Sequence, residues 1–258
     1  MKIKILLSVC VSLSWSALAG EPFTQSKFSD VIKDVNVVAA DTKAATPAAV
    51  NVVVKAPDLV RTGPASRAEL TASDQTITRI GANTVFSFEP NSRTVNLEQG
   101  SVLFHAPKGK GGGVIKSGGA SAAVLGTTVI CVKGADGTFK TILLEGEVKV
   151  TLANGKTVTL HDGQMVIVSA DGQSFGQIYD INLENIAGGA LVNGFSHPLD
   201  SWPLIQEAIR KQKRLLAKGT SGEGGGVGNT NQLDNNTFQT LVPPSFGGGQ
   251  RTTPGSLK

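Results

Sequence analysis

Short alternating strand patterns fill residues 66–168, and one glycine-containing figure recurs among them. An apolar strand end is followed two or three residues later by Gly and then by another apolar run, at residues 97–100, 144–146 and 160–163. Glycine at such a junction permits a bulge or sharp bend where a Cβ would clash. Close approach of the backbone to a ligand is the alternative. The pattern predicts a compact all-β domain whose residues serve mainly for packing.

Two segments show the period of two that a half-buried antiparallel sheet requires. In residues 84–89, Phe86 and Phe88 share one face, and in residues 147–152, Val148, Val150 and Leu152 share one. Three Asp-Gly or Asn-Gly pairs, which supply the positive φ of tight hairpins, separate apolar runs: Asp136-Gly137, Asn154-Gly155 and Asp171-Gly172. We therefore expect an antiparallel β-sandwich or roll of about ten or more short strands.

The first residues have the features of a secretory signal peptide. Lys2 and Lys4 precede an apolar stretch at 5–13, and Ala17-Leu18-Ala19 forms a small-x-small cleavage signal. The stretch is shorter than the ~20 apolar residues of a membrane span, so a retained anchor is the less favoured alternative. We expect cleavage after Ala19 and a periplasmic or secreted protein.

The remaining chain divides by composition into segments. Strand candidates at 31–39 and 50–55 flank an Ala/Thr/Pro stretch at 42–49, and Asp200-Ser201-Trp202-Pro203 opens a helix with a polar cap and Pro in its first turn. The predicted organisation is signal peptide 1–19, N-terminal strands and linker 20–62, β domain 63–180, helical extension 181–218 and disordered Gly/Ser/Asn/Pro-rich tail 219–258.

Cysteine and charge limit the possible classes of protein. Removal of the signal peptide leaves Cys131 as the single cysteine, so no internal disulfide can form, and its apolar run favours a core residue over a nucleophile. The formal net charge of +4 falls by two with Lys2 and Lys4. We expect no nucleic-acid partner, because cationic residues cluster only at 210–218.

The Gly-rich stretch at 108–113 resembles a phosphate loop only superficially. A P-loop needs G-x-x-x-x-G-K-[ST] between a strand and a helix, whereas this stretch lies between β segments and lacks the Lys-Ser/Thr ending. A flexible hairpin loop is the favoured interpretation, and a weak anion contact through Lys108 and Lys110 stays open.

The remaining polar residues form no catalytic or metal motif. His105 and His161 are interpreted as surface histidines near turns, and His161-Asp162 stands near no nucleophile elbow. Glu145 and Glu147 could face one way across Gly146, but exposed adjacent Glu residues are commonly solvated charges. We expect no enzyme activity, no metal site and no cofactor.

The helix at 202–218 is amphipathic and basic. Ile205, Ala208, Ile209, Leu215 and Leu216 recur at helical spacing beside a cationic cluster, Arg210, Lys211, Lys213 and Arg214, which we take as the candidate anion or partner contact. The helix could cap the β domain, which is the default, engage an anionic lipid or glycan surface, or dock on a protein.

The order of motifs across residues 59–168 resembles the FecR domain, a bacterial periplasmic domain. The motifs are 79–83 (RIGAN), 97–102 (LEQGSV), 126–131 (GTTVIC), 142–150 (ILLEGEVKV) and 160–164 (LHDGQ). Val129 stands where the family often has an aromatic residue and Cys131 where it often has Val; both stay apolar. The resemblance implies a β-rich module that contacts other proteins or ligands and carries no catalytic residues.

Signalling through a sigma factor is in doubt for this chain. The regulator that names the family has a cytoplasmic segment and a membrane-spanning helix before its periplasmic domain, whereas this chain begins with a predicted signal peptide. The leading hypothesis is an exported non-enzymatic binding or scaffold module that contacts an envelope protein. The alternative is a surface protein that binds glycan or envelope polymer through the basic helix at 210–218, in a salt-sensitive manner.

Overall fold

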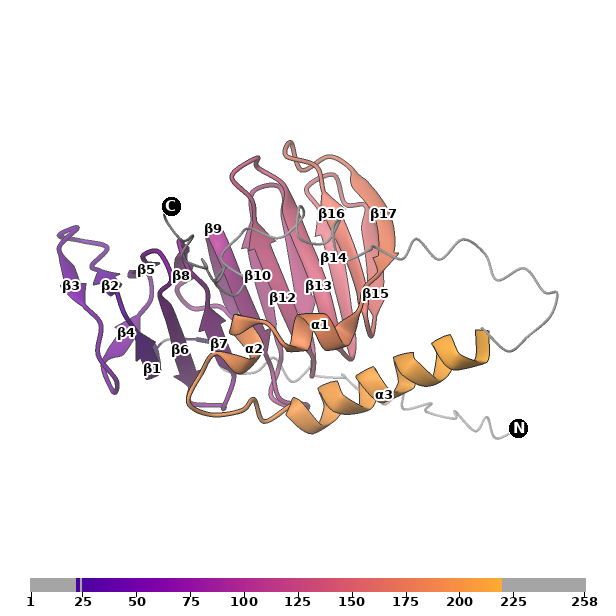
Figure 1. The fold of residues 1–258 in the computed structure, drawn as a ribbon. Coiled ribbons are helices and arrows are strands. Elements are labelled where there is room, and N and C mark those ends of the chain that lie inside the picture. Colours follow the sequence, from indigo (N-terminus) through magenta and orange to yellow (C-terminus); the bar gives the residue numbers. More distant parts are fainter. Residues whose placement is uncertain (1–21, 24, 220–258) are drawn as a thin grey trace, which may run out of the picture.

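The computed structural model describes residues 22, 23 and 25–219. The predicted signal peptide and residues 220–258 of the predicted tail lie outside these residues. The described part is an all-β fold with three helices near its C-terminal end (Figure 1), as the sequence predicts.

Seventeen strands are found in the described residues, and they form two facing sheets that share one long strand, β9 (Thr94–His105). Sheet A contains, in spatial order, β4 (Val53–Lys55), β1 (Gln25–Ile32), β6 (Arg67–Ala72), β7 (Ile77–Ile80), β9, β12 (Thr128–Lys133), β13 (Phe139–Glu145), β16 (Gln164–Val168) and β17 (Phe175–Asp180). Sheet B contains β3 (Ala45–Pro47), β2 (Val35–Val38), β5 (Leu59–Thr62), β8 (Val85–Phe88), β9, β10 (Gly113–Ser117), β11 (Ala120–Val124), β14 (Glu147–Leu152) and β15 (Thr157–His161).

The chain builds the two sheets alternately, one hairpin at a time. The hairpins β10–β11 and β14–β15 join sheet B, and β12–β13 and β16–β17 join sheet A. Hairpins of one sheet pair with each other, β11 with β14 and β13 with β16. The pairings between described strands are antiparallel apart from β9 with β10. This arrangement confirms the predicted antiparallel roll.

The recurring glycine figures mark the points at which the chain changes sheet. Gly100 lies where β9 passes from sheet B to sheet A, Gly146 joins β13 to β14, and Gly163 joins β15 to β16. Their φ angles are 88°, 95° and 76°. A Cβ on Gly100 would lie 2.6 Å from Thr84 Cα. The predicted sharp bends are confirmed, and glycine is required because both φ and the close approach exclude a side chain.

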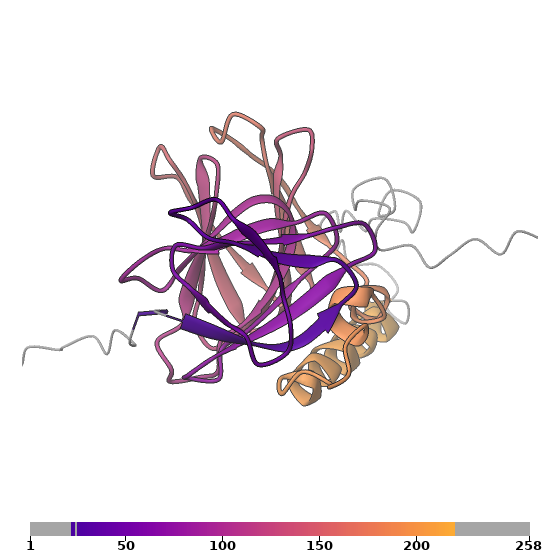
Figure 2. The ribbon, with the colours of Figure 1, turned by 90° about the vertical axis from the view of Figure 1, so that its left-hand side faces the viewer.

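Apolar side chains form two separate cores. The first fills the space between the sheets and includes Phe28, Phe86, Phe104 and Val150. The second lies on the outer face of sheet A, where the helices α1 (Leu183–Ala187), α2 (Ala190–Asn193) and α3 (Trp202–Gly219) cover it. Figure 2, seen from the β3 end, shows the helices on one side of the sandwich only. We call residues 181–219 the helical layer.

The predicted strand at 31–39 is wrong in its extent. The chain turns at Lys33, whose φ is 63°, so β1 ends at Ile32 in sheet A and β2 begins at Val35 in sheet B. The Ala/Thr/Pro stretch expected to separate two strands contains the short strand β3. Apolar residues lie on both sides of the polar pair Lys33-Asp34, and this pattern led to the prediction of one continuous strand.

Candidate functional site at the sheet–helix interface

Arg79 is the centre of a buried polar group on the outer face of sheet A. Its side chain is fully buried, and its Nε donates to Glu69 Oε2 at 2.7 Å. The two residues are direct cross-strand neighbours on β6 and β7. The other carboxylate oxygen of Glu69 accepts from Ser29 at 2.6 Å, and Thr71 donates to Ser29 at 3.2 Å. The ion pair is therefore embedded in further hydrogen bonds, which a buried charge needs.

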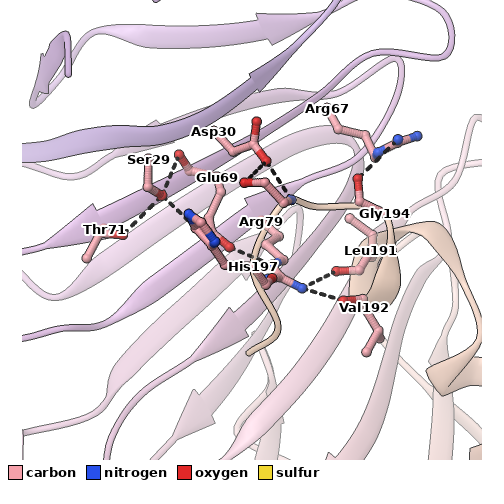
Figure 3. Close-up of polar contacts among 11 residues, drawn as sticks. Ser29, Asp30, Arg67, Glu69, Thr71, Arg79, Leu191, Val192, Gly194 and His197 are labelled. Atoms are coloured by element: carbon pink, nitrogen blue, oxygen red, sulfur yellow. Dashed lines mark hydrogen bonds and ion pairs between the residues drawn. The ribbon is translucent and has the colours of Figure 1, made fainter. Parts of the chain in front are cut away.

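The guanidinium of Arg79 also holds the helical layer. Its two terminal nitrogens donate to the carbonyl oxygens of Leu191 (3.4 Å), Val192 and His197 (2.6 Å), as Figure 3 shows. The guanidinium carbon lies 4.5 Å from the centre of the Phe195 ring, in cation–π contact. Burial lowers the pKa of Arg79, and Glu69 opposes that shift. The Arg79 guanidinium thus donates hydrogen bonds to two carbonyls of α2 and to one carbonyl in the loop that follows it.

Two further residues fix the same loop from sheet A. Arg67 donates to the Gly194 carbonyl at 3.2 Å, and Asp30 accepts from both the backbone N–H and the hydroxyl of Ser196 at 2.9 Å (Figure 3). Burial alone would raise the pKa of Asp30, but the hydrogen bonds from Ser196 outweigh it and leave the pKa below its ordinary value. We call Asp30, Arg67, Glu69 and Arg79 the polar anchor.

A second buried polar group lies where α3 begins. Thr128 Oγ1 is 2.9 Å from His105 Nδ1, 2.7 Å from Glu145 Oε1 and 2.8 Å from Ser201 Oγ, and the four side chains are buried. Burial raises the pKa of Glu145 and lowers the pKa of His105. We call these four residues the Thr128 cluster. It joins β9, β12 and β13 to the residue just before α3.

The Thr128 cluster corrects two interpretations of the sequence. His105 and Glu145 were expected at the surface, but they are only 6% and 5% exposed. Glu145 and Glu147 do not face one way: Glu145 points under α3, whereas the Glu147 side chain is exposed beside His161 in sheet B. The reason is that the helical layer covers the face on which the end of β13 lies.

The predicted contact residues lie on the exposed side of α3. Ile205 and Ala208 are buried, whereas Leu215 and Leu216 are 62% and 52% exposed. The four cations are exposed, and each pairs with a carboxylate: Arg210 with Glu207 (2.8 Å), Arg214 with Glu207 (3.0 Å), Lys211 with Asp162 (3.3 Å) and Lys213 with Glu184 (2.8 Å). Their role as an anion or partner contact stays a prediction.

The remaining candidates from the sequence are Cys131, His161 and Asp162. Cys131 is completely buried in the core between the sheets, and burial raises its pKa to about 12, so the thiol is unreactive and its predicted packing role is confirmed. His161 is exposed as expected, while Asp162 accepts from the Gly146 N–H rather than orienting a histidine.

Sequence reasoning missed the polar anchor, although a signal for it was present. Arg79 stands between Thr78 and Ile80 in a strand whose residues are all buried, and Glu69 lies within a second buried run. A charged residue inside an apolar run predicts a buried ion pair when a neighbouring strand carries the opposite charge. The strand register that makes the two residues neighbours was not available from the sequence.

Residues 58–149 match the family model described as FecR protein. This part of the chain is a FecR domain. The match covers the strands from β5 into β14, and therefore includes Glu69, Arg79 and most of the Thr128 cluster. Ser201 and the rest of the helical layer lie beyond it. The expected family is confirmed.

Among solved structures, the chain is similar to a proposed anti-sigma factor from Parabacteroides distasonis ATCC 8503, determined at 1.65 Å and at 2.50 Å. Both comparisons give 18% sequence identity and a TM-score of 0.44, and they cover 51% of this chain. The chain spans 65% of that protein. A comparison with curated proteins gives no match. Within the described residues, no helix combines the length and apolarity needed to span a membrane.

Proposed function

We propose that the protein is an exported, non-enzymatic FecR-like module that binds another protein of the cell envelope. The match of residues 58–149 to the FecR family supports the proposal, because that family is typical of the cell envelope. The observation that carries the proposal is the edge strand β15 at the end of the sandwich. Among the described residues, β15 pairs with β14 alone.

The composition of β15 favours pairing with a further strand. It reads Thr-Val-Thr-Leu-His, with Thr157, Thr159 and His161 exposed and Leu160 buried. Natural sheets usually blunt an edge with Lys or Pro within the strand, and β15 has neither. An extended segment of a partner can therefore add to sheet B through main-chain hydrogen bonds, with side chains providing specificity.

Buried charge in the protein supports the non-enzymatic part of the proposal. Arg79 and Glu69 pair with each other, and His105 and Glu145 meet at Thr128. These ionisable groups are committed to contacts within the fold, at the interface beneath the helical layer. Hydrolysis of generic ester, glycoside or peptide substrates by the purified protein, abolished by loss of Glu145 or His161, would contradict the proposal.

The binding proposal is tested with Val158→Lys in β15. Val158 is half-buried and points toward the core, and an inward-pointing Lys is a device that natural edges use against pairing. Native envelope fractions are passed over the full chain and over two variants, Val158→Lys and the control Val114→Lys. Val114 is also half-buried but lies in β10, between two paired strands.

We expect a specific protein to be captured by the full chain and by Val114→Lys, and lost with Val158→Lys. Equal capture by the full chain and both variants would mean that the contact lies elsewhere. Capture of polymer alone, released by salt, would instead favour the alternative of glycan binding through Arg210, Lys211, Lys213 and Arg214.

A further inference from the structure

The Gly-rich loop between β9 and β10 lies beside a cavity of about 420 Å³. Gly109, Lys110 and Gly111 line the cavity together with Phe23, Asp74 and Arg93. None of the residues that line the cavity belongs to the polar anchor or to the Thr128 cluster. It does not depend on the proposed protein contact.

The loop backbone has unused hydrogen-bond donors. Gly109, Gly111 and Gly112 have φ angles of 77°, 89° and 67°, in the left-handed region. The Lys110 N–H donates to the Pro107 carbonyl at 3.2 Å, but among the described residues no acceptor receives the N–H groups of Gly109 or Gly111. Backbone N–H groups in such turns form concave sites that suit anions.

Arg93 fixes one end of the loop. Its Nε donates to the Gly112 carbonyl at 2.6 Å, and its guanidinium lies 4.1 Å from the Phe23 ring centre. Asp74 pairs with the same guanidinium at 2.5 Å. The charge of Arg93 is therefore balanced by Asp74, and the loop is held in place before any ligand arrives.

Lys108 and Lys110 supply the excess positive charge at the loop. Both side chains are exposed, and neither forms an ion pair with a described carboxylate, although the buried Glu145 is near enough to Lys108 to feel its charge. Flexible ammonium groups beside open backbone donors match the several oxygens and the negative charge of a phosphate group. Asp74 also lines the cavity and would repel an anion close to it, so the favourable position is against the loop.

We propose that the loop from Lys108 to Gly112 binds a phosphate group, carried either by free phosphate or by the headgroup of an anionic lipid. Leu125 distinguishes the two sources. It is 72% exposed, and its Cδ1 lies 3.2 Å from the position that a Cβ on Gly112 would take. An apolar side chain so close to the loop would enter the membrane interface beside a bound headgroup, but it would not contact free phosphate.

The test uses the full chain, as processed by the cell, at low ionic strength. Inorganic phosphate is titrated while the backbone amides are followed by NMR, and we expect the largest shifts at Gly109, Gly111 and Gly112. The double variant Lys108→Gln/Lys110→Gln should weaken binding by about tenfold, because two charge-assisted contacts are lost. The control Lys149→Gln/Lys156→Gln, two exposed lysines in sheet B and its hairpin turn, should bind as the unaltered protein does.

A second variant keeps both lysines and changes the backbone. Gly111→Ala places a Cβ at a φ of 89°, so the N–H directions must change and binding should fall. Unchanged phosphate affinity in both loop variants, or equal shifts at lysines throughout the surface, would overturn the proposal.

The source is decided with phosphatidylcholine vesicles prepared with and without phosphatidic acid. If a lipid headgroup carries the phosphate, Leu125→Ser weakens binding to the acidic vesicles and leaves the affinity for inorganic phosphate unchanged. If free phosphate is the ligand, acidic vesicles do not bind through the loop, and Lys108→Gln/Lys110→Gln changes only the phosphate titration.

Discussion

Strands β13 and β14 are separated by a single residue, Gly146, and yet they are buried in opposite ways. All seven residues of β13 are buried, whereas β14 alternates between exposed and buried positions. β13 belongs to sheet A, which has the sandwich core on one face and the helical layer on the other. β14 belongs to sheet B, whose outer face carries no such layer in the described residues. The difference comes from what covers each sheet, not from strand propensity.

Charged residues on the outer faces of the two sheets lie in different environments. Lys149 and Glu147 on the outer face of sheet B are solvated charges. Arg79 and Glu145 on the outer face of sheet A lie under the helical layer, where a polar group without a partner is costly. The polar anchor and the Thr128 cluster are the result: they satisfy polar side chains of sheet A and position the layer.

The largest expected effect is at the polar anchor. Arg79→Ala leaves Glu69 buried without its cation and removes the donor to three carbonyls, so we expect a loss of about 3–5 kcal/mol in the free energy of unfolding, measured by urea denaturation. Lys149→Ala, on the open face of sheet B, should change it by no more than about 0.5 kcal/mol. A paired replacement, Glu69→Gln/Arg79→Met, should be less damaging than Arg79→Ala alone. Equal stability of Arg79→Ala and Lys149→Ala would remove the distinction between the sheets.

The apolar part of the covered face should show a somewhat smaller effect. Ile130 in β12 is 2% exposed and belongs to the core under the helices. Ile130→Ala should cost about 3 kcal/mol, because it removes buried methyl groups and leaves a cavity. Thr159→Ala, on the outer face of β15, serves as the matched change in sheet B and should stay within about 0.5 kcal/mol. Thermal and urea unfolding both measure the difference, and a small effect at Ile130 would mean that the helices cover sheet A loosely.

The smallest expected effect is a change in pH dependence. Burial holds the pKa of His105 below its ordinary value, so the unfolded chain takes up a proton near pH 6.5 that the folded protein resists. The contribution of His105 is complete above that pH and is lost as the pH falls toward the lowered pKa. The stability advantage of the unaltered protein over His105→Gln should therefore shrink between pH 7.5 and pH 5.

Thr159→Ala, an exposed change in sheet B that alters no titratable group, provides the control for that measurement. Its unfolding should follow that of the unaltered protein across the same pH range. Glu145 acts in the opposite sense, because burial raises its pKa and stability is lost as the pH rises through that value. Parallel pH profiles for His105→Gln and the unaltered protein would show that the Thr128 cluster does not resist protonation.

The all-β class and part of sheet B could be predicted from the sequence. In β14, Val148 and Val150 alternate with the exposed residues Glu147 and Lys149, and such alternation indicates which face of a strand is buried. The glycine figures predicted the sharp bends for a similarly local reason, since a positive φ must be adopted by a residue that tolerates it. The start of α3 after Ser201 was also readable from its cap and proline.

The candidate site was much less predictable than the fold. Residues His105 and Glu145 lie next to turns, which made them look exposed, and nothing near them in sequence reveals the helix above. The split of the predicted strand 31–39 into β1 and β2 depended on Lys33 taking a left-handed φ, which is uncommon for a residue other than glycine and which the local sequence does not signal.

The sequence by itself determined the all-β class, the bends at Gly100, Gly146 and Gly163, and the alternation of β14, because each depends on φ preferences or on side-chain parity within a few residues. Only the tertiary structure decided that the outer face of sheet A is dry. Arg79 donates a hydrogen bond to the carbonyl of Leu191, 112 residues further along the chain. The alternation of side chains within a strand does not indicate which distant segment will cover its outer face. Burial is a property of the assembled layers, and it changes the polar residues of sheet A from solvated charges into the contacts that fix the helices.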